Sequence, residues 1–82
     1  MEVQDSAVQD LYKIAQMPMP FGKYKGWALV DLPERYVVWF YNQGLPDNEF
    51  GRLMGLLYEI KVNGLEYLFE QLKSFPPPLS NQ

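Results

Sequence analysis

The sequence predicts a single α+β domain over residues 1–82 that is predominantly helical, with an N-terminal helix, a short β-hairpin and three further helices. A chain of 82 residues has room for only one hydrophobic core. Apolar residues recur at helical spacing in four segments, and a glycine-containing segment separates the first from the others. We expect the compact core over about 5–75 and a flexible proline-rich tail over 76–82.

The first two elements are defined by their spacing and by the residues that interrupt it. A helix is expected over 5–16, because Ala7, Leu11 and Ile14 recur on one face and prolines follow directly. A compact β-hairpin or a tight loop is expected over 21–29, where two glycines flank a Lys-Tyr-Lys tip, and we take the hairpin for the fold. Since an isolated hairpin is only marginally stable in water, it must pack on the helices.

The other three helices are bounded by caps and stop signals. The first of them begins at Asp31, which with Glu34 has the spacing of an N-terminal cap, and ends at Gly44. The next runs over 46–64 and ends at an Asn-Gly pair. The last covers about 65–75, where three consecutive prolines prevent its continuation.

Aromatic residues make up 16% of the chain and are expected to reinforce a small core. Most of Trp27, Tyr36, Trp39, Phe40 and Tyr41 should be buried, with one or two exposed as an anchor for a partner. So many large residues in succession cannot share one helix face. Their helix must therefore be sandwiched in the core or expose aromatic side chains.

Composition argues against catalysis. The chain has no histidine and no cysteine, and we find no threonine, so nucleophile–base pairs and most zinc sites are excluded. Asp47 and Glu49 leave open a metal-dependent carboxylate enzyme, but solvated or paired carboxylates are the commoner reading. We expect no enzyme, no cofactor and no bound metal.

The charge and the N-terminus indicate a cytoplasmic protein without a membrane partner. The net charge of −3 repels phosphate backbones and anionic membranes on average. Residues 1–9 carry acids where a secretory signal would carry basic and apolar residues, and no apolar run is long enough to span a bilayer.

The hairpin tip is the one dense basic and aromatic cluster. Lys23 and Lys25 can contact phosphates while Tyr24 stacks on a base, giving weak and salt-sensitive binding to nucleic acid. The alternative is a structural hairpin whose lysines keep its edge soluble and pair with nearby acids. With neighbouring aromatic and basic residues, the candidate binding patch comprises Lys23, Tyr24, Lys25, Trp27, Arg35, Tyr36 and Trp39.

Two other groups are candidates for structural roles. Glu59, Asn63 and Glu66 form a polar corner between the last two helices, and we expect Glu59 and Asn63 to hydrogen-bond to the hairpin backbone or its lysines. Gly51 and Gly55 lie one helical turn apart and allow close approach of another backbone. They mark either a helix seam in a homodimer or close packing within one monomer.

Several phrases resemble a known family. They are Met-Pro-Phe-Gly-Lys-Tyr-Lys-Gly at 19–26, the segments 31–36 and 39–40, and the segments 58–61 and 63–66. In this order and spacing they resemble short bacterial proteins called "putative quorum-sensing-regulated virulence factors", whose function is otherwise unknown. The resemblance covers most of the chain and implies a bacterial protein, but it implies no mechanism.

The first half also resembles a small domain at the C-terminus of exonucleases of the exonuclease X type. This resemblance implies a contact module for nucleic acid or a partner enzyme, without nuclease activity. Together the observations predict a non-enzymatic binding or adaptor module that contacts nucleic acid weakly or an unknown partner protein. A self-associating interaction module is the first alternative, and a carboxylate enzyme is the second.

Overall fold

The computed structural model describes residues 5–72 of the chain. Within them it contains four α-helices and one 3-10 turn, which confirms the predominantly helical character and the order of the helices. These are α1 (Asp5–Gln16), η1 (Leu29–Asp31), α2 (Glu34–Gln43), α3 (Glu49–Val62) and α4 (Tyr67–Gln71). The tail predicted over 76–82 lies outside the described residues.

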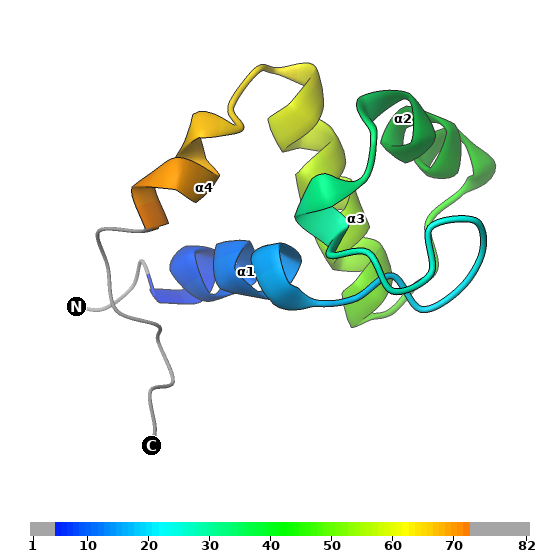
Figure 1. Cartoon of the computed structure of the whole chain (residues 1–82), viewed down its shortest axis with the longest axis horizontal. Coiled ribbons are helices and arrows are strands. Elements are labelled where there is room, and N and C mark those ends of the chain that lie inside the picture. Colours follow the sequence, from blue (N-terminus) through cyan, green and yellow to red (C-terminus); the bar gives the residue numbers. More distant parts are fainter. Residues whose placement is uncertain (1–4, 73–82) are drawn as a thin grey trace.

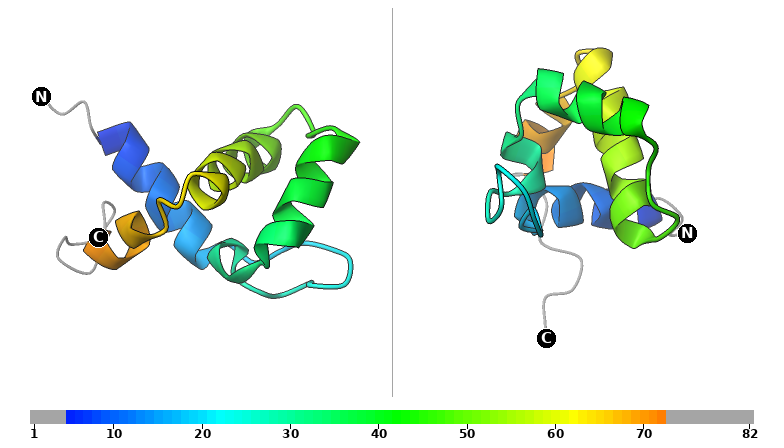
Figure 2. Two further views of the ribbon diagram at one scale, coloured as in Figure 1. Left: turned by 90° about the horizontal axis from the view of Figure 1, so that it is seen from above. Right: turned by 90° about the vertical axis from the view of Figure 1, so that its right-hand side faces the viewer.

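Helix α3 is the central element of the fold (Figure 1). It packs against α2, α1 and η1, while α4 packs on α1. Helix α2 and the connection from α1 to η1 lie together at one end of the molecule, and α4 lies at the other (Figures 1 and 2). The residues of the candidate binding patch therefore gather at the end that α4 does not cover.

The expected β-hairpin is wrong: the described residues contain no strand, and the segment is a loop closed by one antiparallel bridge between Pro18 and Ala28. The amide of Met19 donates to the carbonyl of Trp27 at 2.7 Å. Proline has no N–H to donate, so Pro18 and Pro20 prevent a longer ladder from forming.

The loop turns back through two left-handed glycines. Gly22 and Gly26 have φ angles of 81° and 89°, which residues with a Cβ rarely adopt. Between them, the amide of Lys25 donates to the carbonyl of Gly22 at 3.1 Å. The Lys-Tyr-Lys tip is thus held by turns rather than by strand pairing.

The expected start of the second helix is also displaced. Asp31 belongs to η1, and α2 begins at Glu34 with Pro33 in the N-cap position and no side-chain cap. The carbonyl of Pro33 accepts from the amide of Val37 at 3.1 Å, so the backbone begins the helix there. Because Pro33 restricts the residue before it to an extended conformation, the helix cannot continue back to Asp31.

The predicted Asn-Gly stop of α3 is confirmed. Gly64 has a φ of 68°, and the amide of Leu65 turns back to the carbonyl of Ile60 at 2.8 Å. This geometry is the usual αL ending of a helix. Helix α4 is shorter than expected among the described residues, and the segment 73–75 lies outside them.

The core is aliphatic, so the expected aromatic reinforcement lies around the core and not within it. No aromatic side chain among the described residues is fully buried. The central cluster consists of Ile14, Met19, Leu29, Leu32, Val37, Leu53, Met54 and Leu57. Aromatic residues pack around this cluster, so they cover the core and remain partly accessible to solvent.

Candidate binding surface

Four aromatic rings form a continuous series from the loop to α2. The ring of Tyr24 lies edge-on to Trp27, with 4.8 Å between centroids, and edge-on to Tyr36 at 4.7 Å. Tyr36 in turn stacks on Trp39 at 5.7 Å. Edge-to-face and offset contacts of this kind fix ring orientations. The two tryptophans are therefore held in place by the two tyrosines.

Three phenylalanines attach this end of the loop to the helices. Phe21 lies 6.2 Å from Phe40 of α2 and 5.7 Å from Phe50 of α3, and the latter two rings are 5.8 Å apart. From the sequence, Phe50 was expected only on the apolar stripe of its helix, and Phe21 was given no site role. Their contacts with each other and with Phe40 join the loop, α2 and α3, and helical spacing carries no signal for such contacts.

Both tryptophans present much of their surface to solvent. Trp27 is 48% exposed and Trp39 is 54% exposed, while Tyr36 and Phe40 are half-buried. Tyr41 is also exposed, so the expectation that most of these rings lie in the core is wrong. Of the two alternatives for α2, the helix that exposes aromatic side chains is correct.

The cations of the molecule divide into two groups. Lys13, Arg52 and Lys61 each form an ion pair. Within residues 5–72, the remaining cations form none, and all three belong to the candidate binding patch: Lys23, Lys25 and Arg35. The purely structural interpretation of the hairpin expected its lysines to pair with nearby acids, and they do not.

These three cations are exposed and adjoin the tyrosines in sequence, since Lys23 and Lys25 flank Tyr24 and Arg35 precedes Tyr36. The ammonium of Lys23 lies 5.5 Å from the centre of the Tyr24 ring, within the range of a cation–π contact. Residues 17–44 carry these three cations against two carboxylates, whereas the whole chain has a net charge of −3. We call Lys23, Tyr24, Lys25, Trp27, Arg35, Tyr36 and Trp39 the aromatic–cationic surface.

The acids between α1 and α3 are committed to ion pairs. Lys13 bonds Glu49 at 2.5 Å, and Arg52 bonds Asp10 at 2.6 Å and approaches Glu49 at 3.8 Å. The hydrogen bond that Arg52 donates to Asp10, followed by the charge of that carboxylate, raises the pKa of the Arg52 guanidinium above its ordinary value. Because Glu49 pairs with Lys13 and approaches Arg52, its charge is balanced by cations of the fold.

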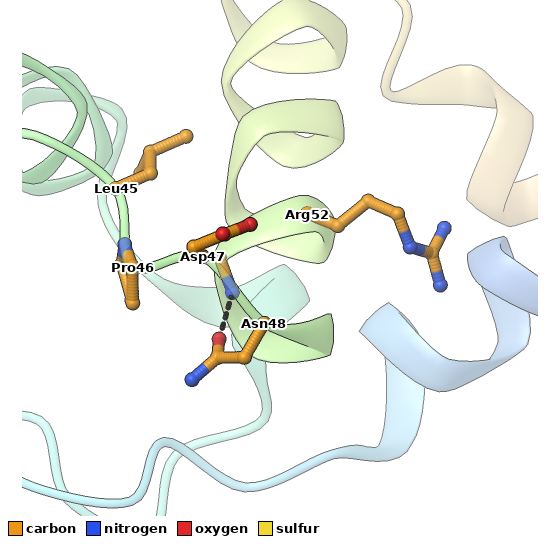
Figure 3. A pocket seen from close by; sticks show the side chains of 6 residues that line it. Leu45, Pro46, Asp47, Asn48 and Arg52 are labelled. Atoms are coloured by element: carbon orange, nitrogen blue, oxygen red, sulfur yellow. Dashed lines mark hydrogen bonds between the residues drawn. The ribbon is translucent and has the colours of Figure 1, made fainter.

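An open pocket lies where the connection from α2 meets α3 (Figure 3). Most of the polar side chains that line it already have partners within the chain. The side-chain oxygen of Asn48 accepts from the amide of Gly51 at 2.9 Å, and Arg52 extends toward α1 (Figure 3). Asp47 is the remaining charged group at the rim. Among the described residues there is no cluster of three or more metal-ligating side chains.

The polar corner is bonded within itself. The side-chain amide of Asn63 donates to the carbonyl of Glu59 at 2.8 Å, and Glu66 bonds Lys61 at 2.9 Å. The expected hydrogen bonds from this corner to the hairpin backbone or its lysines are therefore wrong. Lys61 is buried, and its ammonium donates to the carboxylate of Glu66.

Gly51 and Gly55 both face the connection between α2 and α3. A Cβ on Gly51 would lie 1.8 Å from the carbonyl oxygen of Pro46, and one on Gly55 would lie 3.1 Å from the Leu45 side chain. Of the two roles considered for these glycines, the structure shows close packing within one monomer and not a seam between subunits. Self-association through another surface stays a prediction.

Comparison with known proteins identifies the family. The family model described as "Putative quorum-sensing-regulated virulence factor" matches residues 7–72, which include nearly all of the four helices. The chain belongs to this family. The matched region contains the whole aromatic–cationic surface, so this surface lies within the family domain.

Two curated relatives are similar to the chain. The "Uncharacterized protein YpeB" of Escherichia coli strain K12 is 46% identical over 66 residues, which cover 79% of this chain and 92% of the relative. The protein of the same name in Escherichia coli O157:H7 matches equally well. No solved structure gives a significant match.

Two further expectations concern the resemblance to exonuclease X-type proteins and the membrane. The matches do not show the likeness to exonuclease X-type proteins, which stays a prediction. Among the described residues, no helix has the length and apolar character needed to cross a membrane.

Proposed function

We propose that this protein is a non-enzymatic binding module of the bacterial cytoplasm that holds a partner through the aromatic–cationic surface. The observation that carries the proposal is the coincidence of two half-exposed tryptophans with every unpaired cation of residues 5–72. Tryptophan, tyrosine and arginine are the residues enriched where partners bind most tightly. Exposed apolar residues that are contiguous and bordered by polar groups are typical of interaction sites.

The residue types of the chain support binding rather than turnover. Acyl transfer needs a rigid nucleophile beside a base, and the sequence contains neither histidine nor cysteine. The carboxylate Glu49 is engaged with Lys13, and Glu66 is engaged with Lys61. The family description names a virulence factor that is regulated by quorum sensing, and a binding module can act as such a factor without chemistry of its own.

The proposal is tested by capture from bacterial extract with matched variants. K23Q/K25Q removes two charges from the aromatic–cationic surface. A7E/Q71E makes the same change in net charge at exposed positions of α1 and α4, at the far end of the molecule (Figure 1). Circular dichroism checks that both variants fold like the wild type.

We expect the wild type and A7E/Q71E to retain the same macromolecules, and K23Q/K25Q to lose them. A W27A/W39A variant should lose them as well, because both rings belong to the same surface. If K23Q/K25Q and W27A/W39A retain the wild-type set in the same yield, the surface is not the binding site and the proposal fails.

A further inference from the structure

We propose that the ligand of this surface is single-stranded nucleic acid, with bases stacked on Trp27 and Trp39 and phosphates held by the three unpaired cations. This inference rests on the proposed function and names its partner. It follows from three properties of the molecule: flat rings that are open to solvent, cations that no carboxylate neutralises, and an excess of carboxylates in the rest of the chain.

The rings are suited to stacking. Trp27 and Trp39 stand at the two ends of the series and are both about half exposed. Tyr24 and Tyr36 hold them from inside, so little side-chain freedom remains to be lost when a base stacks. Every base has a flat face, which makes such stacking tolerant of sequence.

The cations select an anionic ligand. Lys13, Arg52 and Lys61 are neutralised by acids of the fold, but Lys23, Lys25 and Arg35 are not. A phosphate backbone supplies one charge per nucleotide beside a flat base. An acidic protein segment can satisfy the cations, but its carboxylates offer the tryptophans no ring to stack on.

The strand must be single because a duplex hides the faces of its bases within its own stack. The site must also be short, because the rest of the chain carries more carboxylates than cations and repels a longer phosphate backbone. We expect about two to three bases in contact, the number that aromatic side chains of small RNA-binding domains stack.

The experiment uses the two tryptophans as reporters. They are the only two in the chain, so quenching of their fluorescence reports directly on this surface. The full chain is titrated with a decamer of deoxythymidylate, with a hairpin duplex of equal charge, with inorganic polyphosphate and with polyglutamate. Binding of the labelled decamer is measured in parallel by fluorescence anisotropy.

We expect the decamer to bind best and to quench both tryptophans. Three phosphate contacts give a slope of about −2 for the logarithm of affinity against that of salt, so a tenfold rise in salt weakens binding about 100-fold. In K23Q/K25Q only Arg35 remains, and the slope should fall to about −0.7, whereas A7E/Q71E should keep the wild-type slope.

The stacking step has its own variants. W27A or W39A should weaken binding by about 5- to 150-fold, which corresponds to the loss of one stacked base. W39F keeps a flat ring and should recover most of the affinity. Because these side chains are half exposed, the variants should fold, and circular dichroism confirms it.

Each result decides one part of the argument. Equal binding of polyphosphate or tighter binding of polyglutamate, unaffected by W27A and W39A, would overturn the nucleic-acid inference and leave an anion-binding surface. No binding of the decamer at low salt would also overturn it, while the capture experiment above decides separately whether the surface binds a partner at all. Tighter binding of the duplex would contradict stacking on exposed bases.

Discussion

Replacing Gly51 with alanine would place a Cβ inside the connection between α2 and α3. Gly51 lies in the first turn of α3, and Pro46 passes directly over it. The added carbon would lie 1.8 Å from the carbonyl oxygen of Pro46 and 2.8 Å from its carbonyl carbon. To reach even a 3.0 Å separation the backbone must move by about 1.2 Å.

The balance of two effects gives the expected magnitude. Overpacking of this kind costs about 1–3 kcal/mol, and alanine returns at most about 1 kcal/mol through its better helix propensity. Gly55 is the matched control, because its new Cβ would meet only the end of the Leu45 side chain, at 3.1 Å. That side chain can move, so G55A should be neutral or stabilising by up to about 1 kcal/mol.

The measurement is urea unfolding of the wild type, G51A and G55A, followed by circular dichroism. We expect G51A to be less stable than G55A by about 2 kcal/mol, or about 8–16 °C in Tm for a domain of this size. The difference should not depend on protein concentration, since the contact lies within one chain. Equal stability of the two variants, or a difference that changes with concentration, would refute the reasoning and favour a seam between subunits.

Three further perturbations test other contacts of the fold by the same unfolding assay. N48A removes the cap of α3 and should lower the free energy of unfolding by about 1 kcal/mol, whereas N48D should retain the wild-type value. If N48A is as stable as the wild type, the side chain does not act as a cap. E66A should lower the free energy of unfolding by about 1–2 kcal/mol, because it leaves the buried ammonium of Lys61 unpaired. K61M should lower it by less, and the reverse order would contradict a pair in which burial of the ammonium depends on Glu66. Tyr41 and Tyr58 stack with centroids 3.7 Å apart. A double-mutant cycle with Y41A and Y58A should therefore give a coupling of about 0.5–1.5 kcal/mol, and strict additivity would show that the stack contributes nothing.

Local signals in the sequence were sufficient to predict where some helices end and which of their faces are buried. The stop at Gly64 was predictable because a left-handed residue after the last turn is a local requirement of the chain. The buried stripe of α3, with Leu53, Met54 and Leu57, was predictable from spacing alone. Both properties depend on residues within a few positions of each other.

What failed depends on contacts between distant segments or on local signals that we weighed wrongly. The prolines at 18 and 20 argue against strand pairing, but the two glycines dominated the prediction of a hairpin. Whether Trp27 and Trp39 are buried is decided by how the loop meets α2, which spacing does not encode. The members of the candidate surface could be named from the sequence because they are near in sequence, whereas the contacts of Phe50 with Phe21 and Phe40 join separate elements.

The most direct test of the aromatic–cationic surface is a two-dimensional amide NMR titration with the deoxythymidylate decamer. The indole N–H signals of Trp27 and Trp39 are the only two of their kind and report on the surface without ambiguity. We expect both to shift, together with the backbone amides of residues 22–27 and 34–40, while those of α1 and α4 stay in place. Shifts confined to α1 and α4, or none at any concentration, would contradict the binding site derived above.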